Sequence, residues 1–196
     1  MKETEALSLD SRRIGALPII NSFLSQIELG SLLDEYVVSR WNQKLSHAQT
    51  IELLVRNILI EREPLYKLSE WSAEFDPTLV GLQQTPPSAL NDDRVGRSLD
   101  ALFDADRASL MTRIVLKVID KFDIDLQQCH NDSTTVTVHG QYASSSSKRH
   151  GKTSVALKHG HNKDHRPDLK QLLFTLTVSR DGAVPIHYKS YDGNTT

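Results

Sequence analysis

The chain has 196 residues, of which 38% are hydrophobic, and its net charge is −2, so it can bury one sizeable core or two small ones. The first 25 residues hold no long apolar run, and we therefore expect neither a signal peptide nor a membrane span. Cys129 is the single cysteine, which excludes an internal disulfide and favours a reducing cytoplasm as the location.

Residues 1–122 are predicted to form a helical domain. Apolar residues recur at helical spacing in residues 19–27 and again in residues 32–37. Ser46 and Gln49 form a capping-box pattern, which predicts that a further helix begins at this point. The wide apolar stripe that follows the pattern indicates that this helix packs against the core of the domain.

The second half of the helical domain has three predicted helices separated by a loop. Pro64 suits the first turn of a helix over residues 65–75, and residues 76–91 have the composition of a loop. Helices over residues 92–103 and 107–122 follow, each preceded by Asn or Asp as a candidate cap. The domain is therefore expected to contain five or six helices.

Two tryptophans of the helical domain are candidates for contact with nucleic-acid bases. Trp41 and Trp71 could each stack on a base, but their spacing within the sequence favours places in the core or in packing. The apolar stripes of the predicted helices contain no cluster of polar residues. These stripes therefore look like core, and they do not reveal whether the helical domain contacts DNA.

The second part of the chain is predicted to form strands. β-Branched residues dominate residues 126–138, and a period of two places Asp132 and every second residue after it on one face. Residues 172–178 are apolar on both faces, which predicts an interior strand. An Asp-Gly pair at 181–182 favours a hairpin, so residues 184–191 should pair antiparallel with that strand. We expect an α+β fold, with helices first and strands after them.

A basic insertion, residues 140–171, separates the first two predicted strands and includes the flexible run 144–147. Its length suggests a functional insertion. Between residues 141 and 171, seven Lys or Arg and two Asp give a net charge of +5, which leaves −7 for the remaining chain. This asymmetry favours an electrostatic contact with nucleic acid, although a solvated basic loop is an equal alternative. The candidate DNA-binding residues are Lys148, Arg149, Lys152, Lys158, Lys163, Arg166 and Lys170.

Three motifs in this order resemble the front part of DDE-type transposases of bacterial insertion sequences. They are Asp-Ser-Thr-Thr at 132–135, Gly-His-x-Lys-Asp-x-Arg-Pro-Asp-Leu-Lys-Gln at 160–171, and Tyr-Asp-Gly-Asn-Thr at 191–195. Residues 16–103 are similar to the helical domain that these proteins carry at the N-terminus. The resemblance implies DNA transposition and recombination, in which a metal-dependent enzyme cleaves and joins DNA at the terminal inverted repeats of the element.

The resemblance also implies a fold and a catalytic residue. Residues 123–196 would be the first, mostly antiparallel strands of an incomplete ribonuclease-H-like domain. Asp132 would be the first Asp of the catalytic triad and a ligand of Mg²⁺ or Mn²⁺. The sequence pattern alone favours a different interpretation, an Asp on the solvated face of an edge strand. The segment 148–170 would contact the DNA backbone, and residues 1–122 would bind DNA ends or form a homodimer.

The sequence departs from the family pattern at its end. The second Asp and the Glu of the triad lie downstream of the Gly-Asn-Thr turn, and the sequence ends at Thr196. Asp164 and Asp168 are expected to form ion pairs with neighbouring cations, and Asp192 is expected to bond its own turn. We therefore expect a truncated transposase that is inactive alone. The alternatives are a non-catalytic DNA-binding or dimerisation module and a decayed remnant without activity.

Overall fold

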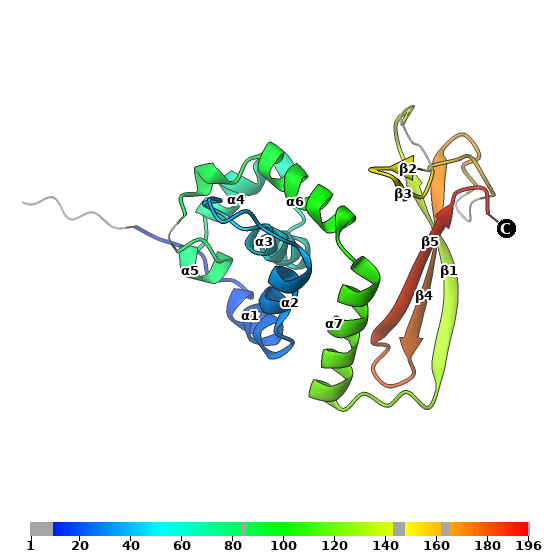
Figure 1. Ribbon diagram of the computed structural model, residues 1–196, viewed down its shortest axis with the longest axis horizontal. Coiled ribbons are helices and arrows are strands. Elements are labelled where there is room, and N and C mark those ends of the chain that lie inside the picture. The colour runs from blue at the N-terminus through cyan, green and yellow to red at the C-terminus, as the bar shows by residue number, and fades with distance from the viewer. Residues whose placement is uncertain (1–9, 84, 143–147, 162–164, 196) are drawn as a thin grey trace, which may run out of the picture. The chain divides into compact units, whose positions relative to one another are not determined.

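The fold is α+β, as predicted from the sequence (Figure 1). In the described part of this computed structural model, seven helices precede the strands. The chain divides into two compact units, Met1–Ile114 and Val115–Thr196, and this division falls inside the last helix. None of the described helices has the length and apolar character needed to cross a membrane. The structure describes residues 10–83, 85–142, 148–161 and 165–195.

The helices of the first unit begin where the local sequence provides caps. Ser46 Oγ accepts a hydrogen bond from Gln49 N at 3.0 Å, and Gln49 Oε1 accepts one from Ser46 N at 2.9 Å, so the predicted capping box is formed. Asn91 Oδ1 caps the sixth helix by accepting from Arg94 N at 2.8 Å. The helices are α1 Leu17–Gln26, α2 Leu29–Tyr36, α3 His47–Ile60, α4 Leu68–Ala73, α5 Pro77–Val80, α6 Asp92–Asp104 and α7 Arg107–Phe122, with 3-10 turns η1 Leu65–Lys67 and η2 Pro87–Ala89.

The prediction that residues 76–91 form a loop is wrong for α5 and η2. Asp76 Oδ1 accepts a hydrogen bond from Thr78 N at 2.8 Å, and Pro77 occupies the first helical position. An Asp cap followed by Pro at the first position is a helix start, because Pro lacks the N–H that the first turn leaves unpaired. Val80, 1% exposed, then anchors this short helix in the core.

The core of the first unit consists of two hydrophobic clusters that meet at α3. Leu53 and Leu54 of α3 belong to the first cluster, and Ala48 and Ile51 of the same helix belong to the second. Each fully buried leucine contributes about 1.5–3 kcal/mol. The first cluster also contains Leu17, Leu45, Leu68, Trp71, Phe75, Val80, Leu82, Leu90 and Val95, and the second also contains Leu24, Leu29, Leu32, Leu33, Val37 and Leu110.

The two tryptophans have opposite environments. Trp71 is 3% exposed and packs against Phe75 with ring centroids 5.1 Å apart, which confirms the predicted packing role. For Trp41 the same prediction is wrong, because its side chain is 97% exposed. Trp41 lies in the loop between α2 and α3, where the neighbouring anchors Val37 and Leu45 are 1% and 2% exposed. Those two residues, and not the tryptophan, fix the loop to the core.

The second unit contains a three-stranded antiparallel sheet, in which β4 lies between β1 and β5 (Figure 1). The predicted interior position of β4 and its antiparallel pairing with the following strand are confirmed. A separate two-stranded hairpin, which the sequence did not reveal, lies within the basic insertion. The strands are β1 Cys129–Val138, β2 Lys148–Arg149, β3 Lys152–Thr153, β4 Lys170–Ser179 and β5 Pro185–Asp192.

Candidate functional site

Asp132 lies on β1, the edge strand of the sheet, with its side chain exposed. Its Oδ1 accepts a hydrogen bond from Ser133 N at 2.7 Å, which orients the carboxylate. Within the described residues, no group of three or more His, Cys, Asp or Glu is placed to hold a metal ion. A two-metal site uses several converging carboxylates, and the described residues do not bring such a set together around Asp132.

On the sheet face that carries Asp132, β1 contributes Asp132 and Thr134 followed by Val136 and Val138, whereas the facing residues of β4 are mainly apolar. Asp132 stands opposite Leu176, and Thr134 stands opposite Phe174. Phe174 in turn stacks on Tyr188 of β5 with ring centroids 5.7 Å apart. Cross-strand neighbours on one face support each other by such contacts. Asp132 is thus held by a regular strand against a packed neighbour, while its carboxylate remains in water.

The hairpin of β2 and β3 brings three of the predicted DNA-binding residues together. Arg149 pairs with Lys152 across the hairpin, and Lys148 pairs with Thr153. His150 and Gly151 form the turn with φ of 49° and 76°, as a two-residue hairpin turn requires. The side chain of Arg149 lies outside what the structure describes.

Arg166 forms an ion pair with Asp168, as predicted. Arg166 Nε donates to Asp168 Oδ1 at 2.8 Å, and its NH2 group donates to Oδ2 at 2.7 Å. The guanidinium lowers the pKa of Asp168 to about 2. Two further residues of this segment, Lys163 and Asp164, were also proposed for contacts and lie outside the described residues. The pairing neutralises Arg166 locally and so reduces its attraction for phosphate.

The remaining two predicted DNA-binding residues also make contacts within the chain. Lys158 Nζ donates to Asp192 Oδ2 at 2.7 Å. Lys170 Nζ donates to the backbone carbonyls of residues 141 and 142 at 2.6 and 3.2 Å. Within the described residues, these acceptors of Lys170 are uncharged carbonyls, whereas the Asp192 carboxylate compensates the charge of Lys158. Lys170 therefore contributes more to the positive potential of the insertion than Lys158 does.

Asp192 binds a distant segment, so the prediction that it bonds its own turn is wrong. Its Oδ1 accepts a hydrogen bond from Ala156 N at 2.9 Å, in addition to the bond from Lys158. The Ala156 N–H and then the Lys158 ammonium lower the pKa of Asp192. A carboxylate at a turn often bonds locally, but here a segment 36 residues earlier supplies the donors.

A tightly packed junction holds the end of the insertion against the sheet. Lys158 and Gln171 exchange backbone hydrogen bonds of 3.1 and 2.9 Å, and the buried Gln171 side chain donates to Gly193 O at 2.8 Å. A Cβ on Gly160 would overlap Gly193 O, and one on Gly193 would overlap Gln171 O. Sequence reasoning missed this junction. Its signal was the pair of glycines within the motifs at 160–171 and 191–195, since glycine permits close backbone approach.

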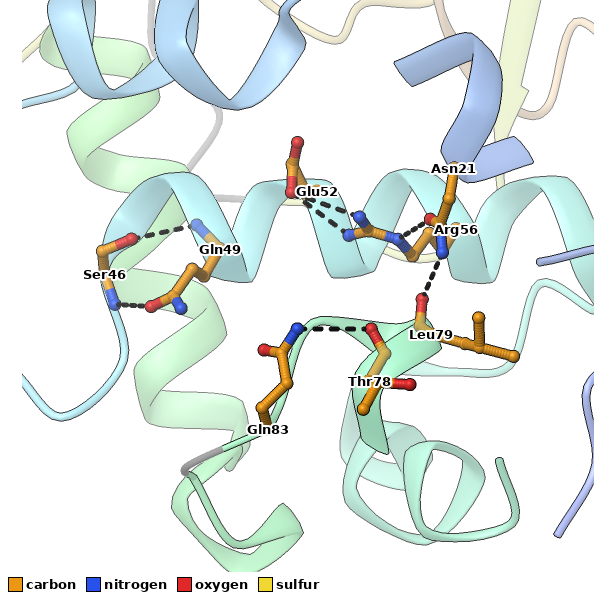
Figure 2. A network of polar contacts seen from close by, with 8 residues as sticks. All are labelled: Asn21, Ser46, Gln49, Glu52, Arg56, Thr78, Leu79 and Gln83. Atoms are coloured by element: carbon orange, nitrogen blue, oxygen red, sulfur yellow. Dashed lines mark hydrogen bonds and ion pairs between the residues drawn. The ribbon is translucent and has the colours of Figure 1, made fainter. Parts of the chain in front are cut away.

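The first unit contains a buried polar network that the sequence did not predict (Figure 2). The Arg56 side chain, 9% exposed, donates from Nε to Asn21 Oδ1 at 2.7 Å. Its two terminal nitrogens each lie 3.3 Å from Glu52 Oε2. Asn21 Nδ2 donates to Leu79 O at 2.8 Å, which ties α1 and α3 to α5. The expectation that the apolar stripes hold no polar cluster is therefore wrong.

A cavity of about 370 Å³ opens beside this network. A Cβ on Gly30 of α2 would lie 2.9 Å from Glu52 Oε1, so a larger residue there would displace the Glu52 carboxylate. The charged residues of the lining are Glu28, Glu52 and Arg56, so one negative charge is left over. Phosphate is therefore a poor match for this cavity, and the three-way contact explains Arg56 as a structural residue.

The comparisons with known proteins give one family. Residues 9–116 match the family model described as a domain of unknown function, DUF4277, and this region covers more than half of the chain. A search of curated proteins and a search of solved structures each returned no match. The helical unit built on α3 is therefore the part of the molecule that the family describes, and the chain belongs to the DUF4277 family.

Proposed function

We propose that this chain is part of a DDE-type transposase, which cleaves and transfers DNA strands at the ends of an insertion sequence. The observation that carries the proposal is the position of Asp132. It presents an exposed carboxylate on the first strand of an antiparallel β1–β4–β5 meander, which follows a helical unit in the sequence. The resemblance of the motifs at 132–135, 160–171 and 191–195 to such transposases assigns the catalytic role to this residue.

Asp132 would serve as the first ligand of Mg²⁺ or Mn²⁺. Such an ion supplies charge stabilisation for in-line displacement at a phosphodiester. The bond from Ser133 N fixes Asp132 Oδ1. Among the described strands, β1 pairs with β4 alone, so its other edge is open to a strand that carries a further acid. A complete ribonuclease-H-like site needs the second Asp and the Glu, which the described residues do not provide.

The DNA contact would centre on the basic hairpin. Lys148, Arg149 and Lys152 lie on two short strands, and Lys170 of β4 donates to uncharged carbonyls. These residues would bind backbone phosphates at the terminal inverted repeats, so affinity would fall as salt rises. The first unit would contribute DNA end binding or homodimer formation. The reducing cytoplasm, where DNA is accessible, is the proposed location.

A nicking assay tests the catalytic proposal. Because the described residues provide one acid of the three, the assay uses the protein expressed from the entire gene. This protein is incubated with Mg²⁺ or Mn²⁺ and a supercoiled plasmid that carries the two sequences flanking that gene. Metal-dependent nicks at the element ends are expected, and Asp132→Asn should abolish them. Asp181→Asn, in the β4–β5 turn, is the matched control and should nick normally. Nicking that survives Asp132→Asn, or the absence of nicking in every variant, would overturn the catalytic proposal.

The second candidate is a DNA-binding module without chemistry of its own. The basic composition of the β2–β3 hairpin favours it, because cations such as Lys148 and Lys152 match phosphate and need no metal site. Under this proposal, the chain binds plasmid DNA in a salt-dependent way but does not nick it. Lys152→Ala should then weaken binding and reduce its salt dependence, whereas Asp132→Asn should leave binding unchanged or strengthen it.

A further inference from the structure

The loop between α2 and α3 presents the most exposed aromatic side chain of the described residues. Trp41 is 97% exposed, and Val38 in the same loop is 80% exposed. Tryptophan has a large apolar area, and most tryptophans are largely buried. Leaving this ring in water therefore forgoes the stabilisation that burial would give. We define residues 38–44 as the Trp41 loop. A loop that keeps a tryptophan in water is a candidate binding surface.

The Trp41 loop is held at both ends and along its length. His47 N donates to Ser39 Oγ at 2.8 Å, and Gln43 N donates to Arg40 O at 3.1 Å to close a turn with Trp41 at its tip. Arg94 of α6 donates to Gln43 Oε1 at 3.3 Å. The tip is thus carried on a fixed base. A loop whose backbone is already ordered loses less conformational entropy when a partner binds to it.

Positive charge surrounds the tip of the loop. Residues 38–44 contain Arg40 and Lys44, both exposed, and no acid. Arg94 and Arg40 also act on the buried His47 ring at the base of the loop, and together with burial they lower its pKa. Arg40 and Lys44 thus lie one and three positions from Trp41 in the same loop, and Arg94 of α6 contacts the loop at Gln43. This combination of a stacking ring with flanking cations is the one used to bind single-stranded nucleic acid.

We propose that the Trp41 loop binds single-stranded DNA, with Trp41 stacked on an unpaired base and Arg40 and Lys44 at the adjacent phosphates. The inference rests on the proposed function, since it names the DNA feature that the helical unit contacts. An anionic partner follows from the two cations and the absence of acid in the loop. A flat partner follows from the exposed ring, because every base has a face on which an aromatic ring can stack.

Binding of an oligothymidylate of about ten nucleotides tests the loop directly. The oligonucleotide is labelled, and its anisotropy is followed with the full chain at low salt. Trp41→Ala should weaken binding roughly 5- to 100-fold, the range expected for one stacked base, and Trp41→Phe should restore most of the affinity. Tyr66→Ala, at an aromatic residue of η1 that is 71% exposed and lies outside the loop, is the matched control and should bind as the original chain does. Lys44→Ala should lower the salt slope by about 0.7.

Tryptophan fluorescence gives a second readout that a structural role would not change. The chain has two tryptophans, and Trp71 is buried, so iodide should reach Trp41 alone. Stacking should quench the Trp41 emission and protect it from iodide when the oligonucleotide binds. Equal affinities for the original chain and Trp41→Ala, unquenched Trp41 emission in the complex, or no binding of the oligonucleotide would each overturn the inference.

The loop and the catalytic proposal fail separately. Loss of oligonucleotide binding in Trp41→Ala without any metal-dependent nicking would support the loop and overturn the catalytic role of Asp132. Nicking that requires Asp132, together with normal oligonucleotide binding by Trp41→Ala, would support the catalytic role of Asp132 and overturn the proposal for the loop. Self-association of the chain that Trp41→Ala prevents, with unchanged oligonucleotide affinity, would also overturn the inference and assign the loop to a protein interface.

Discussion

Replacement of Arg56 by Met should destabilise the helical unit strongly. Met fills much of the space of the arginine stem, but it removes the partner of Asn21 Oδ1 and of Glu52 Oε2. A polar group left unsatisfied in the interior costs about 1–3 kcal/mol, and breaking a fully buried ion pair costs about 3–5 kcal/mol. The Glu52 side chain is 19% exposed and keeps some contact with water. We therefore expect a loss of about 2–3 kcal/mol.

Urea unfolding measures this loss when Trp71 is the reporter. A Trp41→Phe background leaves Trp71 as the remaining tryptophan, and its emission reports on the first cluster of the core. With a slope of about 2 kcal/mol per molar urea, the midpoint should fall by about 1–1.5 M. The double variant Arg56→Met, Glu52→Met should lose less than the sum of the single variants, by about 1 kcal/mol or more, because the two side chains interact.

The exposed pair Arg97 and Asp93 provides the matched control. Its atoms are 3.8 Å apart, and the side chains are 66% and 84% exposed. Arg97→Met should therefore shift stability by less than about 0.5 kcal/mol. A midpoint for Arg56→Met that equals that of Arg97→Met, or strict additivity with Glu52→Met, would refute the reasoning that the buried network stabilises the unit.

Three further outcomes are expected. Gly193→Ala should break the junction, because its Cβ overlaps Gln171 O, and amide exchange at Lys158 should lose its protection; unchanged exchange would contradict the packing. Burial, and then Arg94 and Arg40, lower the pKa of His47 below 6.5, so the folded state favours the neutral ring. The stability that the neutral ring contributes is complete above pH 6.5 and falls as the pH drops below that value, and the urea midpoints of His47→Gln should not show this fall. The pKa of Asp192 lies below 3.8, so its bonds persist as the pH falls to that value and are lost below it; the Ala156 amide shift should follow this titration, and a midpoint above 3.8 would contradict the contact.

Features fixed by neighbours in the sequence could be predicted. The capping box at Ser46 and Gln49 needs only three residues of separation, and both of its hydrogen bonds are present. The interior position of β4 was predicted because both alternating sets of its side chains are apolar, which is typical of central strands, and β4 does pair with β1 on one edge and with β5 on the other. The Asp-Gly pair likewise predicted the turn into β5.

Features that depend on distant partners could not be predicted. Asp192 resembles an ordinary turn residue, yet its partners lie 36 and 34 residues earlier in the chain. The burial of Arg56 could not be predicted, because a charged side chain on a helix usually faces water. It is buried because Asn21 of α1 and Glu52, one turn earlier on α3, both bind its guanidinium. Trp41 has the spacing of a packing residue, and only the placement of Val37 and Leu45 in the core reveals that it points to water.

The charged segment at 160–171 has an architectural role that its composition concealed. Its density of charge suggests a reacting centre, but Arg166 pairs with Asp168, while Gly160 and Gln171 hold the segment against Gly193. Asp132 lies on another strand and makes no part of that junction. Substitutions should therefore separate the two roles. Gly160→Ala should lower stability and nicking together, whereas Asp132→Asn should stop nicking and leave the urea midpoint within about 0.5 kcal/mol of the original chain, since an exposed side chain contributes little to folding. Nicking that survives in a destabilised Gly160→Ala chain would show that the segment does not support the site.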